Sequence, residues 1–382
     1  MNQKETDIRN KFFVLLRSGL WGSLPDEKLF DSQTDWEVLY KESKHQAILG
    51  IVLDGIDLLP AEIRPPRPLY LKWCAEVLGI EDDNKKLDSE IENLYELLRA
   101  DGVEPILMKG QGIARNYRNP EHRSSGDIDI YVGKNDYDKV NALLSKDGKA
   151  KEVWSAKHMA FEWHDVIIEN HRLLATMAAP RAQKNLTRLI KSWHGSDQCY
   201  KCRIGTTIVT MAPLDFDSVF LLLHSVSHLM SSGVGLRQIC DWSLFLHNHR
   251  EEIDKETVIQ YLKDLGLTNA ARIFGALAVR YLGLPKEDLI IPFSEEDERV
   301  ADLLLDDIMR VGNFGISGER SWKKPKNWFK ARIFNFKNTL NRINRLRMID
   351  PEGAAWLPFG NVMTFTRLQS WRVIHRFAPK YK

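Results

Sequence analysis

The chain has 382 residues, a formal net charge of +2 and a hydrophobic fraction of 43%. This composition is that of a folded protein with a sizeable core, and it excludes a disordered chain. No segment approaches the roughly 18 uninterrupted apolar residues of a transmembrane helix, and the start, MNQKETDIRNKFF, lacks the apolar run of a signal peptide. A cytoplasmic location is therefore expected.

The first part of the chain, residues 1–100, is predicted to be a helical region. Residues 5–18 and 34–50 carry apolar residues three and four positions apart, which is the spacing of one helix face. A longer helix is predicted over residues 69–99. It has an apolar stripe on a charged background, formed by Leu87, Ile91, Leu94, Leu97 and Leu98.

The pattern changes at Gly102, and residues 101–212 are predicted to form an α/β core. Short apolar or alternating segments indicate strands, and amphipathic segments between them indicate helices. The expected strands are VEPILMK (103–109), DIDIYV (127–132), HMAFEW (158–163) and DVIIENH (165–171), with a late strand or hairpin in CRIGTTIVTM (202–211). The expected helices are residues 112–118 and 134–148.

After Pro213 the helical spacing returns, which predicts a C-terminal helical domain over residues 213–292. Its helices are expected at 214–231, 235–250, 254–265 and 268–282. The predicted fold class is therefore α+β, with a small mixed sheet and its helices flanked by N- and C-terminal helical regions.

Residues 293–382 are predicted to be a basic, aromatic-rich helical tail. Between Arg320 and Met348 there are ten Lys or Arg residues and no acidic residue, with Trp and Phe interleaved. Such a segment could pack its aromatic face on the rest of the protein, grip a nucleic acid backbone or lie on an anionic membrane surface. All three interpretations remain open at the level of sequence.

The segment DIDIYV contains the strongest chemical signal. Successive side chains of a strand point to opposite faces, so Asp127 and Asp129 share one face while Ile128 and Ile130 face the core. Glu169, on a later predicted strand, could add a third carboxylate. Three carboxylates on neighbouring strands can hold Mg²⁺, an ion that prefers oxygen ligands.

Lys109, Gly110, Gln111 and Gly112 lie between a predicted strand and a predicted helix. Backbone N–H groups at the start of a helix favour a phosphate group, and the Lys109 ammonium would add a positive charge. The spacing is not that of a P-loop. A tight turn without a ligand is the alternative interpretation of the two glycines.

The order of these elements resembles the nucleotidyltransferase superfamily of DNA polymerase β type. The order is a strand, a glycine-containing turn, a helix, a strand with Asp-x-Asp and a later acidic strand. The form KG…Y…R…GDIDIYV followed by EWHDVIIENHRL is more specifically similar to the uncharacterised bacterial nucleotidyltransferase family. The resemblance covers roughly residues 103–173.

The resemblance implies roles for individual residues. Asp127, Asp129 and Glu169 would be the catalytic carboxylates and the metal ligands. The nucleotide-binding residues would be Lys109, Gly110, Gln111, Arg123 and His171, together with His228 and Arg237 from the helical domain. Asp241 would pair with Arg237 one helical turn away.

The implied function is that of an Mg²⁺-dependent (or Mn²⁺-dependent) nucleotidyltransferase. It would transfer NMP from an NTP, with ATP the first donor to expect, to an unidentified acceptor: a metabolite, an RNA or a protein. A different class of function is a catalytically degenerate module that binds a nucleotide or a nucleic acid on the same fold. Gln111, which stands where a small residue is usual, and the long link from Gly110 to Asp127 favour that alternative.

Overall fold

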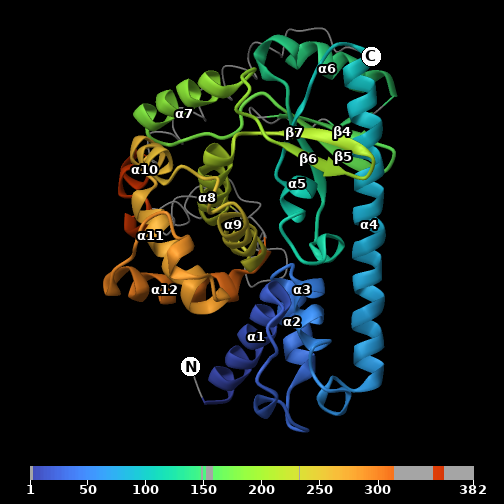
Figure 1. Ribbon diagram of the computed structural model, residues 1–382, viewed down its shortest axis with the longest axis vertical. Coiled ribbons are helices and arrows are strands. Elements are labelled where there is room, and N and C mark those ends of the chain that lie inside the picture. Colours follow the sequence, from blue (N-terminus) through green and yellow to red (C-terminus); the bar gives the residue numbers. More distant parts are fainter. Residues whose placement is uncertain (1–2, 148, 152–157, 232, 314–346, 357–382) are drawn as a thin grey trace, which may run out of the picture.

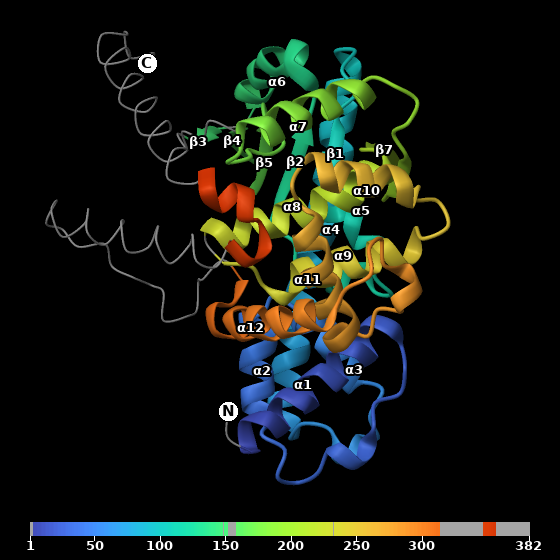
Figure 2. The same cartoon turned by 90° about the vertical axis from the view of Figure 1, so that its left-hand side faces the viewer.

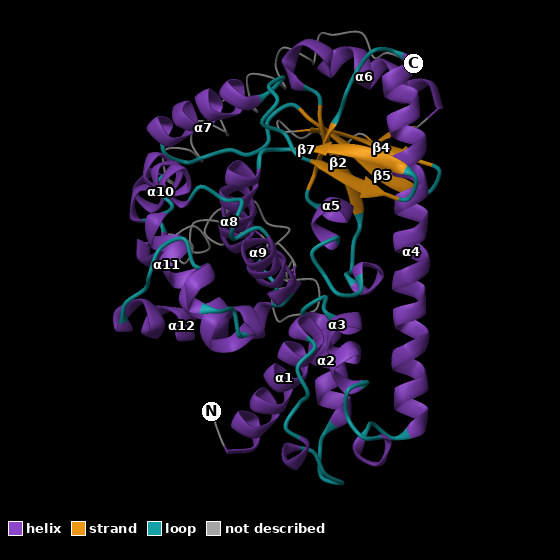
Figure 3. Cartoon of the chain, viewed as in Figure 1, coloured by secondary structure: helices purple, strands orange, loops and turns teal. Residues whose placement is uncertain are grey.

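The computed structural model of the protein describes residues 3–147, 149–151, 158–231, 233–313 and 347–356. A long helix, α4, runs along one side of the molecule and joins two regions (Figure 1). Helices α1 to α3 gather around one end of α4, and the β-sheet packs near the other (Figures 1 and 2). A group of later helices lies across from α4, as Figure 3 also shows.

The N-terminal region consists of α1 (Gln3–Trp21), α2 (Trp36–His45) and α3 (Leu49–Ile56). The helical spacing noted over 34–50 is divided between α2 and the start of α3, because Ala47 takes a left-handed conformation with φ 56° and separates the two helices. Helices α1 and α3 cross closely at Gly19 and Gly55. A Cβ atom on either glycine would collide with a backbone carbonyl of the other helix.

Helix α4 (Arg67–Ala100) confirms the long helix predicted over 69–99. Pro68 lies in its first turn, where the missing N–H costs nothing. Its apolar stripe faces the protein, since Leu87, Ile91, Leu94 and Leu98 are all at most 3% exposed. A helix of this length spans about 50 Å, enough to reach from the N-terminal helices to the sheet.

The sheet has seven strands in the order β3-β4-β5-β2-β1-β7-β6. It is mixed, because β2 pairs antiparallel with β1 but parallel with β5, and β1 pairs parallel with β7. The strands are β1 (Ile106–Met108), β2 (Asp127–Tyr131), β3 (Lys149–Lys151), β4 (His158–Trp163), β5 (Val166–His171), β6 (Lys201–Ile204) and β7 (Thr207–Met211). The mixed sheet and the predicted α+β class agree.

Strands β4 and β5 form the predicted hairpin with a two-residue turn. The turn residues His164 and Asp165 have φ 44° and 64°, the left-handed conformations that a tight hairpin turn requires. Counting back from this turn pairs His158 with His171 at the far end of the hairpin. The second predicted hairpin, in 202–211, is formed by β6 and β7.

The helices around the sheet agree with the sequence in part. Helix α5 (Gly110–Ala114) is shorter than the predicted 112–118 and begins directly at the Lys109–Gly110 step, and α6 (Gly133–Asp147) matches its prediction. Helix α7 (Pro180–Trp193) was not predicted, although Ala182, Leu186 and Trp193 bury one face of it.

The C-terminal helical part begins where expected, with α8 (Leu214–Ser231), α9 (Leu236–Asn248), α10 (Lys255–Asp264) and α11 (Thr268–Leu277). Helix α11 continues as a π-helical turn to Leu282. Helix α12 (Glu295–Val311) packs against α11 and has an acidic first turn closed by a capping box between Ser294 and Asp297. The basic segment that follows lies almost entirely outside the described residues.

Among the helices that the structure describes, none combines the length and the apolar character needed to cross a membrane.

Candidate active site

A cavity of about 320 Å³ lies between strands β2, β4 and β5 of the sheet and helices α8 and α9. Its walls carry nearly all of the polar side chains that the sequence singled out. Its lining residues are Lys109, Gly110, Arg123, Ser125, Gly126, Asp127, Asp129, His158, Glu169, His171, Leu174, Leu221, His224, Ser225, Ser227, His228, Arg237, Gln238 and Asp241.

Three carboxylates meet on the sheet side of this cavity. Asp127 and Asp129 extend from the same face of β2, while Ile128 and Ile130 are buried on the other face. Strand β5 pairs with β2 in a register that places Glu169 beside Asp129. One oxygen from each of the three carboxylates lies within 4.8 Å of the other two, which is close enough for a shared cation.

The Lys109–Gly110 turn places a cation next to these acids. Lys109 has φ 58° and Gly110 has φ 46°, so two consecutive residues are left-handed where β1 passes into α5. A lysine in this conformation costs on the order of 1–3 kcal/mol, and such strain is typical of functional sites. The turn directs the Lys109 ammonium to within 2.8 Å of Asp129 Oδ2.

Asp129 is buried and fully engaged. His171 contacts its other oxygen, with 2.6 Å between Nε2 and Oδ1. Burial alone would raise the pKa of Asp129, but the Lys109 ammonium and the hydrogen bond from His171 outweigh it and hold that pKa well below its usual range. Burial likewise opposes the charged form of His171, yet its hydrogen bonds with Asp129 and Glu169 raise its pKa to about 9.

Asp127 differs from its neighbour because it opens to the cavity. Its carboxylate makes no hydrogen bond and no ion pair in the described part of the chain. The negative charge of Asp129, followed by burial, raises the pKa of Asp127 to about 6. The charges of Lys109 and Arg237 offset this rise only in part, so a bound cation would further stabilise the ionised carboxylate.

The opposite wall is held together by a buried ion pair. Both Asp241 oxygens accept from Arg123, at 2.7 and 2.8 Å, and the Tyr117 hydroxyl donates to the same carboxylate at 2.7 Å. Asp241 was expected to pair with Arg237, so the sequence prediction named the wrong principal partner. Arg237 instead donates to the Ser124 carbonyl at 2.6 Å, and Ser124 lies in the loop that leads into β2.

His224 and His228 share a face of α8 and border the cavity together. Their Nε2 atoms lie 3.0 Å apart, and their rings meet edge to face. Burial, followed by the positive charge of Lys109, holds the pKa of His224 well below its usual value. His224 is therefore a neutral imidazole that can donate or accept one hydrogen bond on the helical wall.

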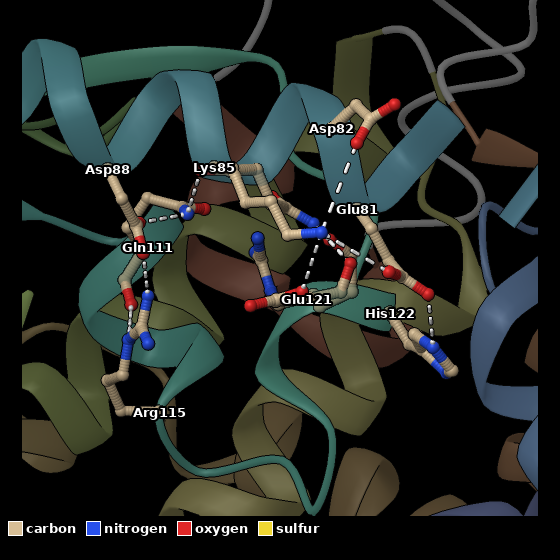
Figure 4. A network of polar contacts seen from close by, with 10 residues as sticks. Glu81, Asp82, Lys85, Asp88, Gln111, Arg115, Glu121 and His122 are labelled. Carbon is tan, nitrogen blue, oxygen red and sulfur yellow. Dashed lines mark hydrogen bonds and ion pairs between the residues drawn. The ribbon is translucent and has the colours of Figure 1, made fainter. Parts of the chain in front are cut away.

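Gln111 is the one predicted site residue that the structure does not bring to the cavity. Its side chain turns toward α4, where Nε2 donates to Asp88 at 2.5 Å and to the Asn84 carbonyl at 3.3 Å (Figure 4). Asp88 also pairs with Arg115, so this network fixes α5 against the long helix. The side chain of Gln111 thus has a packing role.

Two histidines of the cavity were not assigned a role from the sequence. His158 begins β4, and His224 lies one helical turn before His228 on α8. The position of His158 follows from the two-residue hairpin turn, because counting back from that turn sets it opposite His171. The sequence carried this signal, but it becomes meaningful only once β5 is known to carry the site.

The fold and the site together define a protein of the nucleotidyltransferase class. They combine a mixed sheet that presents three carboxylates, a strained Lys-Gly turn before a helix, and a helical wall. The family model described as uncharacterised nucleotidyltransferase matches residues 32–283. Because this match covers most of the chain, the protein belongs to that family.

A solved structure is also similar, the crystal structure of an antigenic nucleotidyltransferase-like protein from Paracoccidioides brasiliensis. It shares 9% sequence identity, with a TM-score of 0.32, over 58% of this chain and 96% of the other. A likeness of that degree carries no argument about function. No curated protein matches the chain.

Proposed function

We propose that this protein is a divalent-metal-dependent nucleotidyltransferase that transfers NMP from an NTP to an acceptor nucleophile. The observation that carries the proposal is the meeting of Asp127, Asp129 and Glu169 within 4.8 Å of one another, next to the Lys109–Gly110 turn. Three carboxylates and a phosphate-binding turn are the parts that such a reaction needs.

The metal in this proposal is Mg²⁺ or Mn²⁺, held by Asp127, Asp129 and Glu169. The donor set fits, because all three ligands are carboxylate oxygens and Asp127 has no cationic partner of its own. A divalent ion bound there would neutralise negative charge on the triphosphate as pyrophosphate leaves.

The chain's own residues bind and orient the substrate. Lys109 would exchange its contact with Asp129 for a phosphate oxygen, and the N–H groups at the start of α5 would cradle the same phosphates. Arg237 and His228 line the facing wall and are the candidates for a second set of substrate contacts. Arg123 is committed to Asp241, so its proposed part is to position that wall rather than to bind phosphate.

The proposed chemistry is an in-line displacement at phosphorus. The acceptor oxygen forms a new bond to the α-phosphorus, and the bond from that phosphorus to the bridging β-phosphate oxygen breaks, releasing pyrophosphate. The acceptor proton passes to a base. One of the three carboxylates is the candidate for this base, since all three line the cavity beside the Lys109–Gly110 turn.

ATP is the first donor to test, and the acceptor remains a small metabolite, an RNA or a protein. The basic segment that would distinguish these acceptors lies almost wholly outside the described residues. A second candidate is a binding module without catalysis. Two observations favour it: Gln111 offers no side chain to the cavity, and both oxygens of Asp129 are already engaged.

The test is thermal unfolding of the full chain with ATP, GTP, CTP or UTP, each with and without Mg²⁺. A nucleotide at about 100 times its Kd stabilises the folded state by about 2.7 kcal/mol, which is a measurable rise in Tm. We expect an Mg²⁺-dependent rise for wild type that Asp127→Asn abolishes. The exposed acid Asp165 offers a matched control, and Asp165→Asn should retain the rise.

Transfer itself is followed with α-labelled NTP and candidate acceptors. Label transfer that requires Asp127 supports the enzyme. Nucleotide binding with no transfer to any acceptor class favours the binding module. Absence of a thermal shift with all four nucleotides contradicts the enzyme and favours a module that binds a nucleic acid instead.

A further inference from the structure

A second group of metal-ligating side chains adjoins the three carboxylates. His158, Glu169 and His171 each offer one ligand atom, and these atoms lie within 4.8 Å of one another. The β4–β5 hairpin creates the group, since His158 pairs with His171 across the strands while Glu169 and His171 share a face of β5. The two imidazole rings meet edge to face with centroids 5.0 Å apart.

The hydrogen bonding of the imidazoles leaves nitrogen atoms available. In the neutral form that a metal ion requires, His171 donates from Nε2 to Asp129 and the ion takes the place of the Nδ1 proton; this buried Nδ1 has no hydrogen-bond partner. His158 Nδ1 is also buried and lies 3.3 Å from Glu169 Oε2 without the geometry of a hydrogen bond. Buried polar atoms without partners are costly, so these two Nδ1 atoms, on residues that pair across the hairpin, indicate a missing ligand.

We propose that His158, Glu169 and His171 bind a divalent transition-metal ion such as Zn²⁺. Two imidazole nitrogens and one carboxylate oxygen suit Zn²⁺ or Mn²⁺, whereas Mg²⁺ prefers oxygen ligands only. Asp129 then takes the second role that carboxylates often have around metal sites, because it accepts the Nε2–H of His171 and orients that ring.

This site is distinct from the Mg²⁺ site of the proposed reaction, although the two share Glu169. Its other donors are imidazoles that the three-carboxylate group does not use. Binding of Zn²⁺ by these donors would therefore hold whether or not the chain transfers a nucleotide. If both ions bind, Glu169 is the carboxylate that they have in common.

The proposal is tested by titrating the chelator-treated full chain with Co²⁺, followed by its visible absorption, and then displacing Co²⁺ with Zn²⁺. We expect His158→Gln to weaken Zn²⁺ binding at least about tenfold, as the loss of a ligand or of its orienting partner does. Asp127→Asn should leave Zn²⁺ binding unchanged, because Asp127 belongs only to the carboxylate group. Circular dichroism shows whether each variant is folded.

Pulsed EPR of Mn²⁺ bound to the wild-type chain provides a readout that needs no variant. Nitrogen coupling from imidazole to Mn²⁺ supports the site. Equal Zn²⁺ affinity in wild type and His158→Gln overturns it. Loss of Mg²⁺-dependent nucleotide binding in Asp127→Asn with Zn²⁺ binding retained separates the two sites.

Discussion

The ion pair between Arg123 and Asp241 joins the loop before β2 to helix α9 and thereby holds two walls of the cavity together. We predict that Asp241→Asn destabilises the protein strongly while keeping the shape of the side chain. The carboxylate that it removes accepts two hydrogen bonds from Arg123 at 2.7 and 2.8 Å, and one more from Tyr117.

The magnitude follows from burial. The side chains of Arg123 and Asp241 are only 5% and 7% exposed, so water cannot take over the charge of Arg123 when its partner is neutral. Removing one partner of a buried pair costs about 3–5 kcal/mol. Arg237 adds to this cost, because burial, followed by the charge of Arg123, already lowers its pKa. We therefore expect a loss of about 3–5 kcal/mol in the free energy of unfolding.

The assay is equilibrium unfolding in urea, followed by the fluorescence of the eleven tryptophans. Glu251→Gln is the matched control, since Glu251 pairs with Arg250 but is 84% exposed, and it should cause no measurable change. The double variant Arg123→Met/Asp241→Asn should recover part of the loss, because the buried guanidinium of Arg123 is then no longer left without its partner. A loss below about 1 kcal/mol in Asp241→Asn would refute this reasoning, as it would mean that the pair is solvated.

Three further predictions concern other parts of the chain. Gly55→Ala should destabilise the N-terminal helices by more than about 2 kcal/mol in urea unfolding, since its Cβ would collide with a backbone carbonyl of α1. Gly79→Ala, on an open surface of α4, should instead stabilise the protein by about 0.5–1 kcal/mol. Equal effects of the two substitutions would contradict the close crossing of α1 and α3. The hydrogen bond that His122 donates to Asp54 raises the pKa of His122 despite burial. Its stabilising effect is therefore fully present below about pH 6.5 and is lost as the pH rises through the higher folded-state value. The difference in unfolding free energy between wild type and His122→Gln should accordingly shrink from pH 6 to pH 9, and a constant difference would exclude this linkage. Lys109→Met should weaken nucleotide binding at least tenfold in titration calorimetry, because it removes the ammonium at the Lys109–Gly110 turn. Unchanged affinity would show that this ammonium pairs only with the buried carboxylate of Asp129 and does not bind phosphate.

Local patterns in the sequence determined most of the individual elements. The apolar stripe predicted α4, strict alternation predicted β2 with its two aspartates on one face, and a two-residue gap predicted the β4–β5 hairpin. These patterns suffice because helix and strand periodicities depend only on neighbouring residues. The roles of the cavity residues remain predictions, to be tested by the experiments above.

What the local patterns did not decide is which distant segments meet. Glu169 lies beside Asp129 only because β5 joins β2 in parallel, a pairing between residues about forty positions apart in the chain. Asp241 likewise pairs with Arg123 on a distant loop rather than with Arg237 one helical turn away. The side chain of Gln111 points away from the cavity and hydrogen-bonds Asp88 on α4 because of how α5 packs on that helix. Sequence periodicity sets the face of a helix or strand on which a side chain lies. Which side chain of another element it contacts depends on how whole elements pack, and that is decided by the tertiary structure alone.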